Sequence, residues 1–168
     1  MHQRKQALIF MLMFEPEDQE QQEQLGARLA DCSPATLIVY LKGDLGAGKT
    51  TLVRGYLRGL GYRGTVKSPT YTLMEPYRID GKSVCHLDLY RLADAEELEY
   101  LGIRDLLQEE TVLLIEWPER GEGVLPGADL TIQISHREHG RGVAIFPESD
   151  AGELVIGHLR SVSSGISA

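Results

Sequence analysis

The stretch LIVYLKGDLGAGKTTLV, residues 37–53, constrains the fold more than any other part of the chain. An apolar run stops at Gly43, and the residues from Gly43 to Thr50 fit the pattern G-x-x-x-x-G-K-[ST] between a buried strand and a helix. Glycines at 43, 46 and 48 allow successive backbone N–H groups to point inward, at the positive end of the following helix. Such a nest binds phosphate groups, and the sequence therefore predicts a site for a nucleotide triphosphate.

The residue types of this loop suggest how the nucleotide would be held. Lys49 would reach the outer phosphates as a point charge, and the Thr50 hydroxyl would complete part of the octahedral shell of a magnesium ion. The alternative is a glycine loop that only turns a strand into a helix. The predicted nucleotide contacts in the loop are Asp44, Leu45, Gly46, Ala47, Gly48, Lys49, Thr50 and Thr51.

Glu116 closes the apolar run VLLIE, which reads as a buried strand. In a P-loop fold, a carboxylate at this position holds magnesium directly or through water. An aspartate is more usual there. This departure leaves open whether Glu116 ligates the metal, polarises the attacking water, or does both, and a surface glutamate that simply ends a strand is the alternative.

Asp88 is the second acidic candidate, within the predicted strand VCHLDLYR. Its carboxylate could be aimed at the magnesium water shell or at the attacking water, whereas a solvated strand face is the alternative. His86 is expected to be structural, because no cysteine or second histidine stands near it at metal-ligand spacing. Strand alternation predicts one face formed by Cys85, Leu87 and Leu89 and the opposite face formed by His86, Asp88 and Tyr90.

Residues 67–72, KSPTYT, form a predicted loop with three serine and threonine hydroxyl groups that enters a strand after Pro69. In switch-type nucleotide enzymes, a threonine in a mobile loop contacts magnesium and the terminal phosphate and releases after hydrolysis. Thr70 is the candidate for that role. A plain polar turn explains the same residues equally well.

The rest of the chain reads as alternating helices and strands without an internal repeat. We predict a three-layer P-loop α/β fold whose mixed central sheet has buried strands in the middle and antiparallel strands toward the edge. Asp94 and Glu97 suggest a capping box, and Asp80-Gly81 suggests a two-residue hairpin. The predicted helices are 17–31, 51–60, one after Asp94, and 154–159; the predicted strands are 37–41, 71–78, 84–91, 111–115 and the hairpin strands LTIQI and VAIF.

Length and composition fit one domain, because 168 residues with 42% hydrophobic content can bury a core. We expect this domain over residues 1–160 and a disordered tail over residues 161–168. Residues 7–14 are apolar and follow Arg4 and Lys5, but they are too short for a membrane span and lack a cleavage site. Residues 1–14 are therefore expected to contain an edge strand or an over-extended start.

Charge and cysteine content limit the binding partners and the cellular compartment that we expect. The formal net charge of -8 and a pI near 5.1 do not favour binding to nucleic acid or to an anionic membrane surface. Any action on RNA would need a partner that holds it. Cys32 and Cys85 are too few for a disulfide framework or a zinc site, so we expect no stable disulfide and a cytoplasmic location.

Four motifs together resemble a specific family: GDLGAGKTT at 43–51, SPTYTL at 68–73, HLDLYR at 86–91 and IEWPE at 115–119. In this order and at these distances they are similar to the bacterial TsaE ATPases. The resemblance implies a small P-loop ATPase, with ATP and Mg²⁺, that is required for threonylcarbamoylation of adenosine 37 in tRNAs reading codons that start with A. It also implies that the partners TsaB and TsaD carry out the transfer and contact the tRNA, while this protein binds that pair and hydrolyses ATP.

The resemblance implies roles for individual residues as well. Lys49 and Thr50 match the phosphate and magnesium contacts, Thr70 the switch-like loop, and Asp88 and Glu116 the acidic pair. Trp117, the single tryptophan, matches an aromatic residue beside the site and could pack over the nucleotide edge. The chain departs from the family in its N-terminal extension through Met13.

Two other functions use the same phosphate-binding loop. A small-molecule or nucleoside kinase needs a second substrate pocket and usually an arginine-bearing lid, and the only insert available, residues 92–110, is mostly acidic. An ATP-dependent interaction switch would need little turnover. A GTPase is less attractive, because no Asn-Lys-x-Asp element follows the last strands. We expect slow hydrolysis by the free protein, unless Arg91 or a partner neutralises the γ-phosphate.

Overall fold

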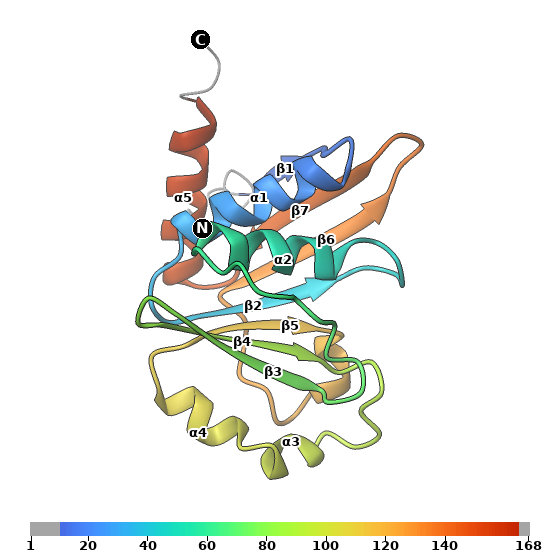
Figure 1. The fold of residues 1–168 in the computed structure, drawn as a ribbon, viewed down its shortest axis with the longest axis vertical. Coiled ribbons are helices and arrows are strands. Elements are labelled where there is room, and N and C mark those ends of the chain that lie inside the picture. The colour runs from blue at the N-terminus through green and yellow to red at the C-terminus, as the bar shows by residue number, and fades with distance from the viewer. Residues whose placement is uncertain (1–10, 165–168) are drawn as a thin grey trace, which may run out of the picture.

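The computed structural model describes residues 11–164, which contain both helices and strands (Figure 1). The helices are α1 (Gln19–Asp31), α2 (Lys49–Gly59), α3 (Glu97–Tyr100), α4 (Ile103–Gln108) and α5 (Asp150–Ser164), with a 3-10 helix over Pro118–Gly121. The strands are β1 (Leu12–Phe14), β2 (Leu37–Lys42), β3 (Met74–Ile79), β4 (Lys82–Asp88), β5 (Val112–Glu116), β6 (Leu130–His136) and β7 (Arg141–Pro147).

All these strands join one sheet in the order β1-β7-β6-β2-β5-β4-β3. The four central strands β6, β2, β5 and β4 are parallel to one another. Antiparallel pairs lie at both edges, where β7 and β1 follow β6 and where β3 follows β4. The mixed sheet predicted from the sequence is therefore confirmed, with β2, the strand before the glycine-rich loop, at its centre.

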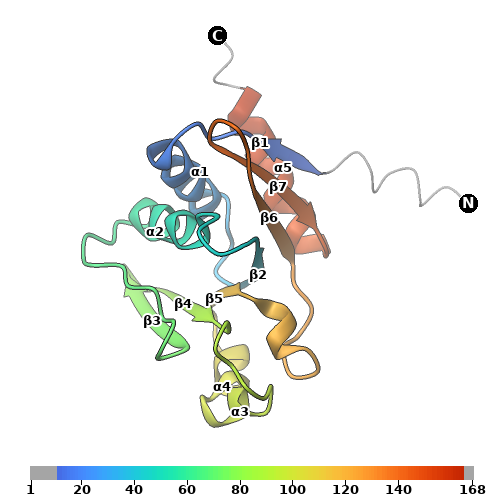
Figure 2. The same cartoon turned by 90° about the vertical axis from the view of Figure 1, so that its right-hand side faces the viewer.

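Both faces of the sheet are covered, which makes the fold three-layered as predicted. Helices α1 and α2 lie together on one face (Figure 2), and their apolar residues share one core with Val155, Ile156 and Leu159 of α5. On the other face, Leu98 of α3 and Ile103 of α4 pack against β4 and β5. Because the central strands are buried on both faces, their sequences are nearly continuous runs of apolar residues.

Local sequence signals explain where several elements begin and end. Helix α1 begins after Asp18, whose carboxylate accepts a hydrogen bond of 2.8 Å from the backbone N–H of Gln21. Between β3 and β4, Asp80 and Gly81 both have positive φ, 49° and 78°. This conformation is the one that a two-residue hairpin of the predicted kind requires.

The predicted strands 71–78 and 84–91 are too long at the ends nearest the site. β3 begins only at Met74, because Leu73 has a φ of 66° and its N–H bonds to the carbonyl of Pro69 at 2.7 Å. β4 ends at Asp88. The tight turn before β3 and the early end of β4 both place loop backbone beside the glycine-rich loop.

The predicted capping box is wrong. Helix α3 begins at Glu97 after Glu96, and no side chain caps it. The carboxylate of Asp94 instead accepts a hydrogen bond of 2.9 Å from the N–H of Glu96, a local turn that competes with helix.

The ends of the chain also differ from expectation. Helix α5 runs to Ser164 instead of stopping at Leu159, so the expected disordered tail is wrong for residues 161–164. Within the helix, the Ser161 hydroxyl donates to the carbonyl of Gly157 at 2.8 Å. At the other end, β1 forms the edge strand over residues 12–14. Residues 1–10 and 165–168, including the rest of both predictions, lie outside the described residues. From residue 11 to residue 164, no helix has the length and apolar character needed to cross a membrane.

Candidate nucleotide-binding site

The glycine-rich loop connects β2 to α2, and its backbone needs glycine at each of its three glycine positions. Gly43, Gly46 and Gly48 have φ values of 154°, 77° and 100°. A Cβ on Gly43 would lie 2.6 Å from the carbonyl oxygen of Ile134, and one on Gly48 would lie 2.5 Å from the Gln22 side chain. Glycine thus supplies both the backbone conformation and the space that this loop requires.

Side chains from outside the loop hold its carbonyl oxygens. Gln22 Nε2 of α1 donates to the Gly48 carbonyl at 2.8 Å. From the start of β7, Arg141 donates through Nε to Ala47 O at 3.1 Å and through Nη2 to Gly46 O at 3.3 Å. Sequence reasoning missed both residues. The sequence does mark Gln22 as unusual, because it is a polar residue on the apolar stripe formed by Leu25 and Leu29. No sequence pattern marks Arg141, which only the tertiary structure brings to the loop.

Lys49 is buried at the start of α2, with 5% of its surface exposed. Its ammonium donates to the Gly43 carbonyl at 2.6 Å and lies 3.8 Å from the centre of the Trp117 ring. Burial lowers the pKa of Lys49, and the carboxylates of Glu116 and Asp88 oppose that shift. Trp117 therefore lies beside the site, as the resemblance implies, and its ring contacts Lys49.

Trp117 has the backbone conformation of a residue in the left-handed region, with a φ of 55°. This conformation is uncommon for a large side chain and costs free energy unless surrounding contacts compensate. Its ring packs against Tyr90 at 5.1 Å between centroids. Together these contacts place the ring over Lys49 at the mouth of the pocket.

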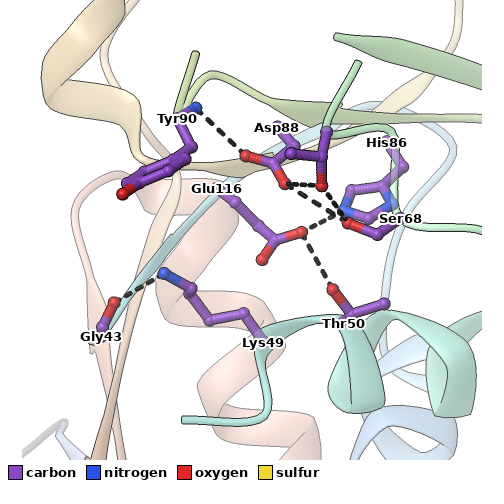
Figure 3. Close-up of polar contacts among 9 residues, drawn as sticks. Gly43, Lys49, Thr50, Ser68, His86, Asp88, Tyr90 and Glu116 are labelled. Atoms are coloured by element: carbon purple, nitrogen blue, oxygen red, sulfur yellow. Dashed lines mark hydrogen bonds and ion pairs between the residues drawn. The ribbon is translucent and has the colours of Figure 1, made fainter. Parts of the chain in front are cut away.

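The two acidic candidates end neighbouring parallel strands and lie side by side. Asp88 of β4 pairs in register with Glu116 of β5, and both side chains point toward the start of α2 (Figure 3). Asp88 and Glu116 are 6% and 3% exposed, so the alternatives of a solvated strand face and a surface glutamate are wrong. Glu116 Oε2 lies 3.4 Å from the Thr50 hydroxyl.

His86, which we expected to be structural, contacts Glu116 although it does not line the pocket. It is fully buried, and its Nε2 lies 2.6 Å from Glu116 Oε2. Strand alternation had already placed His86 on the same face as Asp88. The sequence did not reveal that Glu116 is the partner of His86, because the two residues are 30 positions apart and lie on different strands.

The hydroxyl-bearing loop before β3 reaches Asp88. Ser68 and Thr70 bond to each other at 2.9 Å, and each hydroxyl lies 3.4 Å from Asp88 Oδ2. The other carboxylate oxygen, Oδ1, accepts the N–H of Tyr90 at 3.1 Å. The structure therefore brings Thr70 to the acidic pair, and it adds Ser68, which sequence reasoning did not single out.

One pocket collects most of the residues predicted from the sequence. Two predicted contacts do not line it: Asp44 borders an adjoining hollow that shares Lys49 and Trp117 with the pocket, and the Ala47 side chain is fully buried in the core. The pocket is lined by Leu45, Gly46, Gly48, Lys49, Thr50, Thr51, Ser68, Thr70, Asp88, Tyr90, Glu116 and Trp117.

The donor atoms of this pocket fit a magnesium ion that is bound together with a nucleotide. Thr50 and Glu116 offer hydroxyl and carboxylate oxygens, the ligand type that Mg²⁺ prefers. In the part of the chain from residue 11 to residue 164, no three His, Cys, Asp or Glu side chains are arranged to hold a metal by themselves. Mg²⁺ commonly keeps waters and binds through one or two protein ligands plus substrate phosphates.

Comparison with known proteins agrees with this arrangement. Residues 16–143 match the family model described as threonylcarbamoyl adenosine biosynthesis protein TsaE. The tRNA threonylcarbamoyladenosine biosynthesis protein TsaE of Haemophilus influenzae is 52% identical over 120 residues, which cover 71% of this chain and 76% of that protein. The protein of the same name from Synechocystis is 46% identical over 102 residues, covering 58% of this chain and 64% of its own length.

The fold is shared with a solved structure. The crystal structure of YdiB from Bacillus subtilis matches with a TM-score of 0.78 and 26% sequence identity, covering 91% of this chain and 96% of that chain. This likeness supports the P-loop NTPase fold. Because the family model spans the glycine-rich loop, Asp88 and Glu116, the chain belongs to the TsaE family of threonylcarbamoyl adenosine biosynthesis proteins.

Proposed function

We propose that this protein binds ATP with Mg²⁺ in the pocket around Lys49 and hydrolyses it in support of tRNA threonylcarbamoyladenosine formation. One observation carries the proposal: the carboxylates of Asp88 and Glu116 are buried side by side, next to a glycine-rich loop whose conformation suits phosphate binding. Two carboxylates that are buried side by side are costly unless hydrogen bonds and a cation stabilise their charge. The relatives are named tRNA threonylcarbamoyladenosine biosynthesis proteins, which supports a role in that pathway.

The phosphates would be held by the loop and by Lys49. Its ammonium now donates to the Gly43 carbonyl and rests on the Trp117 ring. A phosphate oxygen is a stronger acceptor for a buried ammonium than a neutral carbonyl is. We therefore expect Lys49 to turn toward the β- and γ-phosphates when ATP binds, with Thr51 close to the phosphate chain at the start of α2.

Thr50 and Glu116 would hold the magnesium ion. When bound, the ion neutralises charge that develops on the phosphate oxygens. The Glu116 carboxylate is directed to the start of α2, where the hydroxyl of Thr50 lies 3.4 Å away. Because the helix begins there, the Thr50 hydroxyl and the Glu116 carboxylate lie beside the place where the loop would present the phosphates.

Asp88 would orient the attacking water. The N–H of Tyr90 holds Oδ1, and the hydroxyls of Ser68 and Thr70 lie near Oδ2. An oriented carboxylate can accept a hydrogen bond from water and align it with the γ-phosphate. Since Thr70 shares this carboxylate, loss of the γ-phosphate would change the contacts of its loop, as a switch requires.

The proposal includes partners. We propose that the protein docks on TsaB and TsaD, which contact the tRNA, and that it is not itself the threonylcarbamoyl transferase. Its net charge of -8 disfavours direct binding to tRNA. Cys32 and Cys85 are both buried and free, which suits a cytoplasmic protein without disulfides.

Slow hydrolysis by the free protein is part of the same proposal. Lys49 is the only basic side chain among the described residues that line the pocket. Arg91 lies instead over the Tyr71 ring, 4.6 Å from its centroid. An arginine that stabilises the transition state raises the rate of such enzymes by roughly 10³ to 10⁵. Partner binding would have to move Arg91 or supply another cation.

The kinase alternative finds less support than the ATPase. The insert at residues 92–110 carries α3 and α4, which pack through Leu98 and Ile103 on the face of the sheet opposite α2. A lid has to close over the phosphates. This insert instead forms part of the second core.

The test is ATP hydrolysis by the purified protein, alone and with TsaB and TsaD from the same organism, beside Glu116→Ala and the exposed control Glu122→Ala. Binding of ATP is measured separately by calorimetry. We expect the pair to stimulate the wild type and Glu122→Ala equally, while Glu116→Ala binds ATP without turnover. Turnover that ignores the pair and needs a small phosphate acceptor would favour a kinase. Threonylcarbamoylation that persists with Glu116→Ala would favour an interaction switch.

A further inference from the structure

His86 contacts Glu116, yet the mechanism described above gives it no task. Its ring is fully buried on β4, on the face that also carries Asp88. Nε2 lies 2.6 Å from Glu116 Oε2, whereas Nδ1 has no hydrogen-bond partner among the described residues. A buried polar atom without a partner destabilises the fold. An apolar side chain, such as that of Val84 two residues earlier on the same face, would avoid this cost.

The contact fixes one oxygen of Glu116. An ionised carboxylate only accepts hydrogen bonds, so in the contact with an ionised Glu116 it is Nε2 that donates to Oε2. The Thr50 hydroxyl lies 3.4 Å from the same oxygen. Figure 3 shows the second carboxylate oxygen directed away from His86, toward the side of the pocket where Lys49 lies. Oε1 is therefore the oxygen left for a ligand.

We infer that His86 is a positioning residue, which holds Glu116 through Oε2 so that Oε1 is presented to the metal and the nucleotide. This inference rests on the proposed ATPase function. Glu116 needs such a donor because its carboxylate is buried, and the contact to Thr50 is long. Without His86, the carboxylate would lose its short hydrogen bond and could rotate toward Lys49. Outer-shell partners of metal ligands typically change activity roughly 10- to 100-fold when they are removed.

The first test compares His86→Leu with His86→Gln. Leucine keeps the volume apolar, whereas the glutamine amide can place an N–H near the position of Nε2. We expect His86→Leu to lower kcat by roughly 10- to 100-fold, with ATP affinity at saturating Mg²⁺ nearly unchanged, and His86→Gln to recover most of the rate. Urea unfolding of each variant reports its stability. Equal losses in two variants that both remain folded would overturn the inference.

A double-mutant cycle tests whether His86 acts through Glu116. If it does, His86→Leu raises the Mg²⁺ concentration needed for ATP binding in the wild-type background, but adds almost no further rise in the Glu116→Gln background. Independent rises that multiply in the double variant would overturn the inference. A wild type without ATPase activity would refute the proposed function.

A spectroscopic measurement separates the two proposals. The ¹⁵N-resolved NMR spectrum of the histidine side chains should show a downfield Nε2–H signal, assigned to His86 by its absence in His86→Gln. We expect this signal to move in Glu116→Ala and to stay in place in Glu122→Ala. A signal that is absent from the wild type, or that ignores Glu116, would overturn the role of His86 even if ATP is hydrolysed.

Discussion

At the residue scale, the site depends on side chains that are buried although they are charged or polar. Lys49, His86, Asp88 and Glu116 each expose 6% of their surface or less. Such groups persist in a folded protein when they are paired or when they bind a charged ligand. Gly43 and Gly48 are sensitive to substitution for a second reason, because an added Cβ would clash with the Ile134 carbonyl or the Gln22 side chain.

Gly48→Ala should destabilise the protein and weaken ATP binding. A φ of 100° is strained for alanine, and the new Cβ would displace the Gln22 amide from the loop. We expect a loss of about 1–3 kcal/mol in the free energy of unfolding, measured with urea, and a raised ATP dissociation constant. The control is Gly157→Ala, an exposed position in α5 with no atom within 4 Å of the added Cβ. It should gain about 0.5–1 kcal/mol.

Cys85 should make stability depend on alkaline pH. Burial raises its thiol pKa from 9.0 to about 12. Above pH 9 the unfolded chain loses this proton while the folded protein keeps it, so the free energy of unfolding falls as pH rises. From pH 9 to pH 10, the wild type should lose about 1 kcal/mol more than Cys85→Ala, measured by urea unfolding. Equal pH dependence would contradict an elevated thiol pKa. Tyr56, whose pKa is also raised to about 12, titrates equally in both proteins.

At the scale of elements, the glycine-rich loop is supported by neighbours that the sequence places far away. Helix α1 contributes Gln22, and β7 contributes Arg141. Strand β7 is itself held by β6 and β1 in antiparallel pairs. The edge of the sheet therefore helps to shape the loop at its centre.

Arg141→Met should weaken ATP binding with only a small loss of stability. The change removes two hydrogen bonds to the carbonyls of Gly46 and Ala47 but keeps an aliphatic side chain. We expect a cost of about 1–2 kcal/mol in binding, roughly a 5- to 30-fold rise in the dissociation constant by calorimetry. Arg137→Met, which removes an exposed ion pair with Glu15, serves as the control. Similar effects of the two changes would mean that Arg141 acts only through its charge.

At the scale of the whole molecule, the sheet separates two hydrophobic cores, and only one of them supports the glycine-rich loop. One lies under α1, α2 and α5 and carries the loop, and the other lies under α3 and α4. The site opens at the carboxyl ends of β2, β5 and β4. Ligands of open α/β sheets commonly bind outside this end of the strands.

Leu98→Ala should therefore separate stability from binding. Leu98 is fully buried in the second core, so the change should cost about 2–5 kcal/mol in unfolding free energy. ATP affinity at 25 °C should stay within a factor of two, because α3 does not line the pocket. The control Leu154→Ala, at a side chain that is 67% exposed, should change stability by less than about 0.5 kcal/mol. A large loss of affinity would show that the second core shapes the site.

The sequence by itself determined the central βαβ part of the fold and most of the pocket. The phosphate-binding loop, the buried strands and the acidic strand ends are local patterns, which short-range spacing specifies without knowledge of the partner strand. Thr50, Asp88 and Glu116 were found this way. The same reasoning set the strand boundaries near 71–73 too early, because the positive φ of Leu73 depends on the turn it packs into.

Only the tertiary structure decided which polar groups meet. His86 reaches Glu116 through the register of two parallel strands, and Arg141 reaches the loop from 94 residues away. Helix α5 continues past its predicted end while its apolar face joins the core beneath α1. These contacts depend on how elements pack, which the chain's local preferences do not encode, since a hydrogen bond between distant residues leaves no periodic trace in the sequence.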